Sequence, residues 1–266
     1  MATVRPVGLR GMLRPQPENI HLRFSDYLVH TELPALPKGG YGHLANEPQG
    51  FWGWYGNNMC GDCVAAGAMH ETMVFAKATH RPIPTFNRTW EDNYSEMLVA
   101  GGGQPYDPHD RSTDTGLDPQ VAAGYRRTQG IVDDNGDVHK IDAYALIEDI
   151  DQLKLCIYLF GVAGWGGALP ATAEQQFGRG YIWDDLRSQP NPHNGHYTPI
   201  CAFNSAGHFV HSTWDSLQAS LPDYVERYWS IGVAYLSQEY MLASGKSPEQ
   251  YDWASLEDDL QSIIAT

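Results

Sequence analysis

A run of small and apolar residues that begins at a cysteine constrains the fold of this chain most. Over residues 62–78 such side chains recur at helical spacing, and the run closes at Pro82. Gly67 would let another element approach this helix closely, and Asp62 stands where an N-cap residue is expected. The sequence therefore predicts a buried helix with Cys63 at its amino end.

The two halves of the chain carry different patterns. The first half predicts further helices over residues 89–100 and 118–127. The second half begins with a short helix over residues 151–160 and then carries apolar segments typical of strands, at residues 162–168, 197–203, 209–214 and 229–236. We expect an α+β fold with a helical lobe over about residues 41–149 and a β-rich lobe over about residues 150–266.

Residues 1–40 lack a sustained period and are rich in proline, which predicts an extended N-terminal arm. Only residues 25–33 look helical or strand-like. The first 23 residues carry four arginines against one acidic residue, Glu18. The arm could therefore dock on the acidic surface of a protein partner, or it could be a short pro-segment that covers a cleft.

Charge and hydropathy exclude several classes of function. The formal net charge of −15 disfavours binding to phosphate backbones and anionic lipids, so we expect neither a nucleic-acid partner nor a membrane partner. No apolar run reaches the length of a membrane span, and residues 1–15 lack the apolar core of a secretory signal. We expect a soluble protein without a signal peptide, cytoplasmic or virion-associated.

Four cysteines are too few for a disulfide scaffold in a chain of 266 residues. Cys156 and Cys201 lie in apolar runs, where free thiols behave as small core residues. A reducing compartment fits this usage, although a disulfide between Cys60 and Cys63 stays open on spacing alone.

Cys63 has the setting of a nucleophile. A free thiol with a pKa of about 8.5 is mostly protonated at neutral pH, and a helix N-terminus together with a histidine can lower that pKa. The helix end contributes only about 0.3–1 kcal/mol, so a histidine must reach the thiol. His196 opens an apolar strand in the second half and is the leading candidate. His70, on the same face of the helix as Cys63, is interpreted as structural.

The order of Asn57, Cys63, Gly195-His196 and Trp214 resembles that of papain-like cysteine peptidases, as a divergent member of bacterial or phage type. The resemblance implies a two-lobed fold with a cleft and hydrolysis of a peptide or amide by a Cys63–His196 pair, with no cofactor and no metal. Asn57, six positions before Cys63, would bind the oxyanion together with the Cys63 N–H. Ser212 or Asp215 would orient His196.

The sequence also departs from the family pattern at four positions. Asn57 replaces a longer glutamine, Asp62 replaces a small residue, Val64 replaces an aromatic one, and Ser212 replaces the family asparagine. A second hypothesis is therefore a catalytically degenerate papain-like scaffold that acts as a structural or binding protein, for instance in a phage or bacterial assembly.

Two other chemistries are weaker alternatives. Cys60-Gly61-Asp62-Cys63 has the spacing of a thioredoxin-type redox motif, but no apolar strand precedes it. A zinc site could use Cys60 and Cys63 with His193 and His196. The two histidines lie in a proline-rich loop that carries no second C-x-x-C pair, which weakens this alternative. The segment Asp134-Asn135-Gly136-Asp137 indicates a hairpin turn more strongly than a calcium loop.

Overall fold

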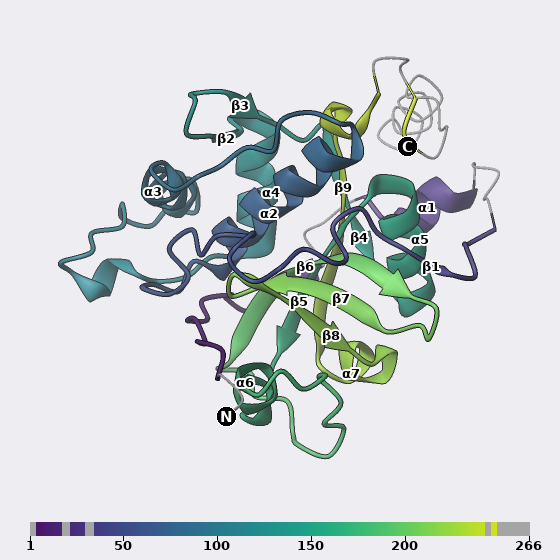
Figure 1. Ribbon diagram of the computed structural model, residues 1–266. Helices are drawn as coiled ribbons and strands as arrows, with labels where there is room; N and C mark the ends of the chain where they lie inside the picture. The colour runs from purple at the N-terminus through teal and green to yellow at the C-terminus, as the bar shows by residue number, and fades with distance from the viewer. Residues whose placement is uncertain (1–3, 18–21, 30–34, 243–245, 249–266) are drawn as a thin grey trace.

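The computed structural model describes residues 4–17, 22–29, 35–242 and 246–248. Three helices from the first half, α2 (Cys63–Ala78), α3 (Trp90–Ala100) and α4 (Pro119–Thr128), gather on one side of a sheet built mainly from the second half (Figure 1). The predicted α+β fold, helical first and β-rich second, is confirmed.

Helix α2 lies directly against the sheet because its surface is made of small residues. A Cβ on Gly67 would come within 2.7 Å of the Tyr197 ring on strand β6 (Gly195–Asn204). Only glycine leaves room for this approach. Nearly the whole of α2 is buried, as the sequence predicted, and its amino end therefore meets the first residues of β6.

The main sheet is antiparallel and runs in the order β4, β9, β5, β6, β7, β8, with β1 also paired to β6. Strand β4 precedes the expected lobe boundary at residue 150, yet it pairs with β9 and belongs to this sheet. The strands are β1 (Gly40–Tyr41), β4 (Ala143–Ile147), β5 (Ala163–Ala168), β6, β7 (Phe209–Thr213), β8 (Ser216–Ser220) and β9 (Trp229–Leu236).

A separate hairpin pairs β2 (Ile131–Val132) with β3 (Val138–His139). The Asp133 carboxylate closes its turn by accepting the backbone N–H groups of Asn135, at 2.8 Å, and Asp137, at 3.0 Å. The acidic run thus forms the predicted hairpin turn.

The remaining helical elements are short and lie around the edges of the sheet. Part of the predicted element at 25–33 and the last residues of the predicted β-rich lobe, 249–266, lie outside the described residues. The described elements are α1 (Phe24–Val29), η2 (Arg111–Thr113), α5 (Ile150–Phe160), α6 (Thr172–Gly178), α7 (Pro222–Arg227) and η3 (Gln238–Tyr240), none of them long and apolar enough to cross a bilayer.

A buried ion pair joins the helices to the sheet, two turns along α2 from Cys63. Glu71 on α2 pairs with Arg126 on α4, and both side chains are almost fully buried. The Tyr197 hydroxyl donates to Glu71 at 2.6 Å and lies 2.7 Å from the Tyr235 hydroxyl. The Arg126 guanidinium lies 4.7 Å from the centre of the Tyr235 ring. We refer to these four residues as the Glu71–Arg126 cluster.

Candidate active site

Cys63 is the first residue of α2, and its thiol lies where the helix meets β6. The residue is only 2% exposed. Its sulfur accepts the backbone N–H of Gly11 at 3.4 Å and also faces the backbone N–H groups of Met12 and Tyr197. The turn before it is held by the Asp114 carboxylate, whose two oxygens each accept the Gly61 N–H at 3.0 Å. The thiol thus lies at a helix N-terminus among backbone donors.

His196 is the second residue of β6 and has no exposed surface. Its Nε2 lies 2.7 Å from the Thr213 hydroxyl, and its ring stacks on Trp214 with centroids 4.6 Å apart. Its Nδ1 is buried and has no hydrogen-bond partner among the described residues. The next residue, Tyr197, faces the Cys63 sulfur through its backbone N–H, so β6 passes the thiol one residue after His196.

The hydrogen bond to His196 that was expected from Ser212 or Asp215 is made by Thr213 instead. The Ser212 hydroxyl lies 2.9 Å from Nδ1 of His70. The Asp215 carboxylate accepts the Gly53 N–H at 2.8 Å. Successive side chains on a strand face opposite sides, so Ser212, one residue before Thr213, lies on the other face of β7. Asp215 lies beyond the end of β7, where the chain turns with positive φ values.

His70 connects Ser212 to the segment before α2. Its Nε2 lies 3.0 Å from the Gly53 carbonyl, while its Nδ1 contacts Ser212. Burial lowers the pKa of His70 to about 4, so the ring is neutral at pH 7. Both ring nitrogens are thus occupied by contacts that link α2, β7 and the preceding loop, as a structural histidine requires.

Asn57 is buried beside Cys63, and its side-chain amide has several acceptors. Nδ2 donates to the Leu9 carbonyl at 3.0 Å and to Asp62 Oδ1 at 3.1 Å, with the Cys60 carbonyl at 3.4 Å. Asn57, Cys63, Ser212 and Trp214 all line one cavity of about 10 Å³. That volume is close to the minimum for a single water molecule, so the site is closed.

The closure comes from residues 4–13, which we call the N-terminal segment. Leu9 donates its N–H to the Asn57 carbonyl at 2.7 Å, and Met12 donates to the Gly195 carbonyl at 3.2 Å. Two further backbone hydrogen bonds join the segment to Leu117. The Leu117 N–H donates to the Gly11 carbonyl at 2.8 Å, and the Leu13 N–H donates to the Leu117 carbonyl at 2.9 Å. The purple stretch between the helices and β5–β6 in Figure 1 is this segment. The predicted arm thus docks on the chain's own cleft.

Glycines make this fit possible. A Cβ on Gly11 would lie 1.6 Å from the Gly61 carbonyl oxygen, and a Cβ on Gly8 would lie 2.4 Å from the Asn57 carbonyl oxygen. The opposite wall is equally close, since a Cβ on Gly116 would lie 2.1 Å from the Gly11 carbonyl oxygen. Any side chain at position 11 would therefore force the segment out of the cleft.

The closed cleft keeps both candidate catalytic groups neutral. Burial raises the pKa of Cys63 to about 11, and Asp62 acts in the same direction against the backbone N–H donors. Burial lowers the pKa of His196 well below its usual range, and the charges of Arg10 and His211 lower it further. Arg10 belongs to the N-terminal segment, so the segment opposes ion-pair formation through both desolvation and charge.

The described residues around Cys63 form neither a disulfide bond nor a metal-binding cluster. All four cysteines are free thiols. Within the described ranges, no three His, Cys, Asp or Glu side chains gather closely enough to hold a metal ion, so the alternative zinc site is not formed. Cys60 is buried, lies 3.5 Å from the Gly56 carbonyl, and has a pKa raised mainly by burial.

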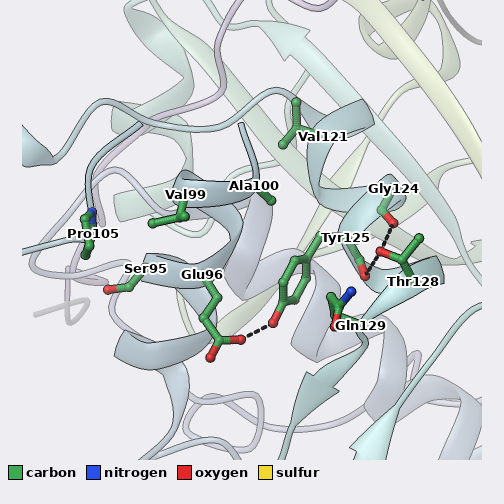
Figure 2. Close-up of a pocket in the computed structure, with 10 residues that line it drawn as sticks. All are labelled: Ser95, Glu96, Val99, Ala100, Pro105, Val121, Gly124, Tyr125, Thr128 and Gln129. Carbon is green, nitrogen blue, oxygen red and sulfur yellow. Dashed lines mark hydrogen bonds between the residues drawn. The ribbon is translucent and has the colours of Figure 1, made fainter. Parts of the chain in front are cut away.

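A separate pocket of about 770 Å³ lies between α3 and α4 and shares no residue with the Cys63 cavity (Figure 2). Its walls are largely apolar, and the Tyr125 hydroxyl donates to the Glu96 carboxylate inside it. It holds no pairing of a nucleophile with a base.

No protein-family model and no curated protein sequence matches the chain. Solved structures do match. Xylellain, a cysteine protease from Xylella fastidiosa, superposes with a TM-score of 0.59 at 13% identity, over 89% of this chain and 98% of that one. The chain has a papain-like fold.

Other structures share this papain-like fold at similar distance. Digestive procathepsin L 3 of Tenebrio molitor larval midgut has a TM-score of 0.59 at 12% identity, over 84% of this chain and 76% of that one. The ragweed pollen cysteine protease Amb a 11 in its proform has a TM-score of 0.52 at 13% identity, over 79% and 69%. At such identities the likeness shows the papain-like fold alone. Whether the chain is active has to be argued from the residues around Cys63.

Proposed function

We propose that this chain is a cysteine hydrolase that cleaves a peptide or amide by acyl transfer, and that its N-terminal segment closes the site. The surroundings of His196 support the proposal most. Thr213 and Trp214 hold its ring, and among the described residues its Nδ1 atom has no hydrogen-bond partner. The residue that follows it on β6, Tyr197, faces the Cys63 thiol at a helix N-terminus. A merely structural histidine would have both nitrogens bonded, as His70 has.

The arrangement supports a thiolate mechanism. With its proton on Nε2 and directed to Thr213, His196 takes the Cys63 proton on Nδ1, and the thiolate attacks the substrate carbonyl carbon. Asn57 Nδ2 and the Cys63 N–H stabilise the oxyanion. His196 then protonates the leaving amine, and a water activated by the same ring hydrolyses the thioester.

The N-terminal segment lies in the cleft in a way that does not lead to cleavage. A substrate must place one carbonyl group with its oxygen at Asn57 and its carbon at the Cys63 sulfur. Here the Leu9 carbonyl reaches Asn57, while the sulfur faces the N–H of Gly11, two residues later. No single peptide bond of the segment meets both groups. We interpret it as a covering pro-segment.

Opening the cleft in the full chain tests the proposal. Gly11→Val cannot keep the segment seated, whereas Gly39→Val is a matched control because no atom lies within 4 Å of the Cβ position there. We expect Gly11→Val to hydrolyse a mixture of fluorogenic peptide amides about tenfold faster or more than Gly39→Val, since 1.4 kcal/mol of lost docking corresponds to a factor of ten. Adding Cys63→Ala or His196→Ala should abolish the gain, and hydrolysis that survives Cys63→Ala contradicts the proposal.

A binding scaffold is the second candidate, and the closed cavity of about 10 Å³ with two neutral groups favours it. Mass spectrometry distinguishes the two functions. A hydrolase opened by Gly11→Val accumulates an acyl thioester on Cys63 with an activated ester of a peptide. A scaffold leaves that cysteine unmodified in the opened chain.

A further inference from the structure

Asp62 is a fully buried carboxyl group at the N-cap of α2, yet it does not cap the helix. No backbone N–H of the first turn donates to its side chain. It also makes no ion pair with any described cation, although isolated carboxylates are almost never fully buried. Its Oδ1 instead accepts the Asn57 amide at 3.1 Å. The Cys60 thiol is a second side-chain partner of Asp62, but the Asn57 amide has the larger effect on the pKa of its carboxyl group.

The contact decides where the second N–H of Asn57 points. A side-chain amide nitrogen carries two hydrogens. Three acceptors surround Nδ2: the Leu9 carbonyl oxygen at 3.0 Å, Asp62 Oδ1 at 3.1 Å and the Cys60 carbonyl oxygen at 3.4 Å. An N–H held by Asp62 leaves the other for the Leu9 oxygen, which occupies the site proposed for the oxyanion. A flipped Asn57 would set its oxygen against these carbonyl oxygens, so its neighbours also fix the rotamer.

We propose that Asp62 is the positioning residue of the oxyanion donor: it holds the Asn57 amide so that one N–H points at the carbonyl oxygen bound over Cys63. This inference rests on the proposed function for its catalytic meaning. It joins two of the departures noted in the sequence, because the shortened amide at 57 and the carboxyl at 62 hold each other. Burial raises the pKa of Asp62 well above its usual range, and the hydrogen bond from Asn57 acts in the opposite direction.

The hydrogen bond from Asn57 to the Leu9 carbonyl helps to hold the segment over Cys63, so the inference can be tested without measuring turnover. Protection of Cys63 is defined as the rate of iodoacetamide alkylation in the Gly11→Val chain divided by the rate with the segment seated. This ratio cancels any change in the intrinsic reactivity of the thiol, provided that each substitution is measured in both backgrounds. Loss of the Asn57–Leu9 bond should lower protection about tenfold, the size expected for a buried hydrogen bond.

A double-mutant cycle in the full chain gives the answer. We expect Asp62→Ala and Asn57→Ala each to lower protection about tenfold, and the double variant to lose no more than Asn57→Ala alone. Asp62→Asn, which keeps an acceptor oxygen, should restore most of the protection. In the Gly11→Val background Asp62→Ala should lower kcat with little change in KM, and only while Asn57 is present.

The outcomes separate the two proposals. Additive losses from Asp62→Ala and Asn57→Ala, with turnover intact in the Gly11→Val chain, overturn the positioning role and leave the hydrolase standing. Coupled losses in protection without any Cys63-dependent turnover support the positioning of Asn57 and overturn the hydrolase. If Asp62→Asn is as damaging as Asp62→Ala, the acceptor oxygen is not what matters and the inference fails.

Discussion

Two of the contacts between the helical half of the molecule and the sheet are built differently. The Glu71–Arg126 cluster is buried, charged and shared by α2, α4, β6 and β9. The N-terminal segment is held by backbone hydrogen bonds, by glycine fits and by a partly exposed ion pair from Arg10 to Glu174. Under the proposed function, the first contact holds the halves together while a substrate replaces the second, and the cleft opens without unfolding.

Breaking the cluster should have the largest effect. Glu71→Ala leaves the Arg126 cation buried without its partner, which typically costs about 3–5 kcal/mol of folding free energy. Urea unfolding followed by tryptophan fluorescence measures the loss. Glu226→Ala, at an exposed carboxylate on α7, is the control and should change stability by less than about 0.5 kcal/mol. If Gly11→Val destabilises the chain as much as Glu71→Ala, the distinction between the two contacts is wrong.

The two faces of β7 should respond differently in the opened chain. Thr213→Val removes the hydroxyl 2.7 Å from His196 Nε2 and keeps the shape of the side chain. We expect kcat of the Gly11→Val chain to fall about tenfold to hundredfold, because a hydrogen bond to a charged group contributes roughly 1.5–3 kcal/mol. Ser212→Ala, the neighbour on the other face, contacts His70 and should change kcat far less. Equal losses at both positions would remove Thr213 as the orienter.

The ion pair of the segment should give the smallest effect. Arg10 pairs with Glu174 on α6, and the two side chains are 21% and 38% exposed. Exposed pairs are typically worth about 0.2–1 kcal/mol, so Glu174→Gln should lower protection of Cys63 by at most about fivefold. The loss should shrink at high salt because the pair is screened. Protection that is unchanged at low salt would show that backbone fits alone hold the segment.

The sequence could predict the parts of this site that depend on local patterns. Small residues at helical spacing place Cys63 at the start of a buried helix, and an apolar strand opens at Gly195-His196, the proposed base. Strand alternation counted back from Trp214 points to Ser212 and not to Thr213. Trp214 lies beyond the end of β7 with a φ of 49°, so the alternation does not continue through it.

The closure of the cleft is less visible in the sequence. Residues 4–13 have no periodicity, and their place depends on fits to Gly61, Gly116 and Gly195, which are distant in the chain. The sequence suggested a pro-segment as one of two roles for the arm. It did not indicate which residues of the arm would lie over Cys63. The contact between Asn57 and Asp62 was equally hidden, because a residue at an N-cap is expected to turn toward the helix.

The most direct test is the pH dependence of Cys63 alkylation, mapped by mass spectrometry in the native chain, in Gly11→Val, and in Gly11→Val with His196→Ala. In the native chain, the pKa of about 11 should keep labelling slow until strongly alkaline pH. Opening the cleft should bring rapid labelling near pH 6, where a thiolate persists only if His196 is protonated beside it. Loss of that labelling with His196→Ala would confirm the pair. If the opened chain labels only near the ordinary thiol pKa of about 8.5, with or without His196, the account of this site is wrong.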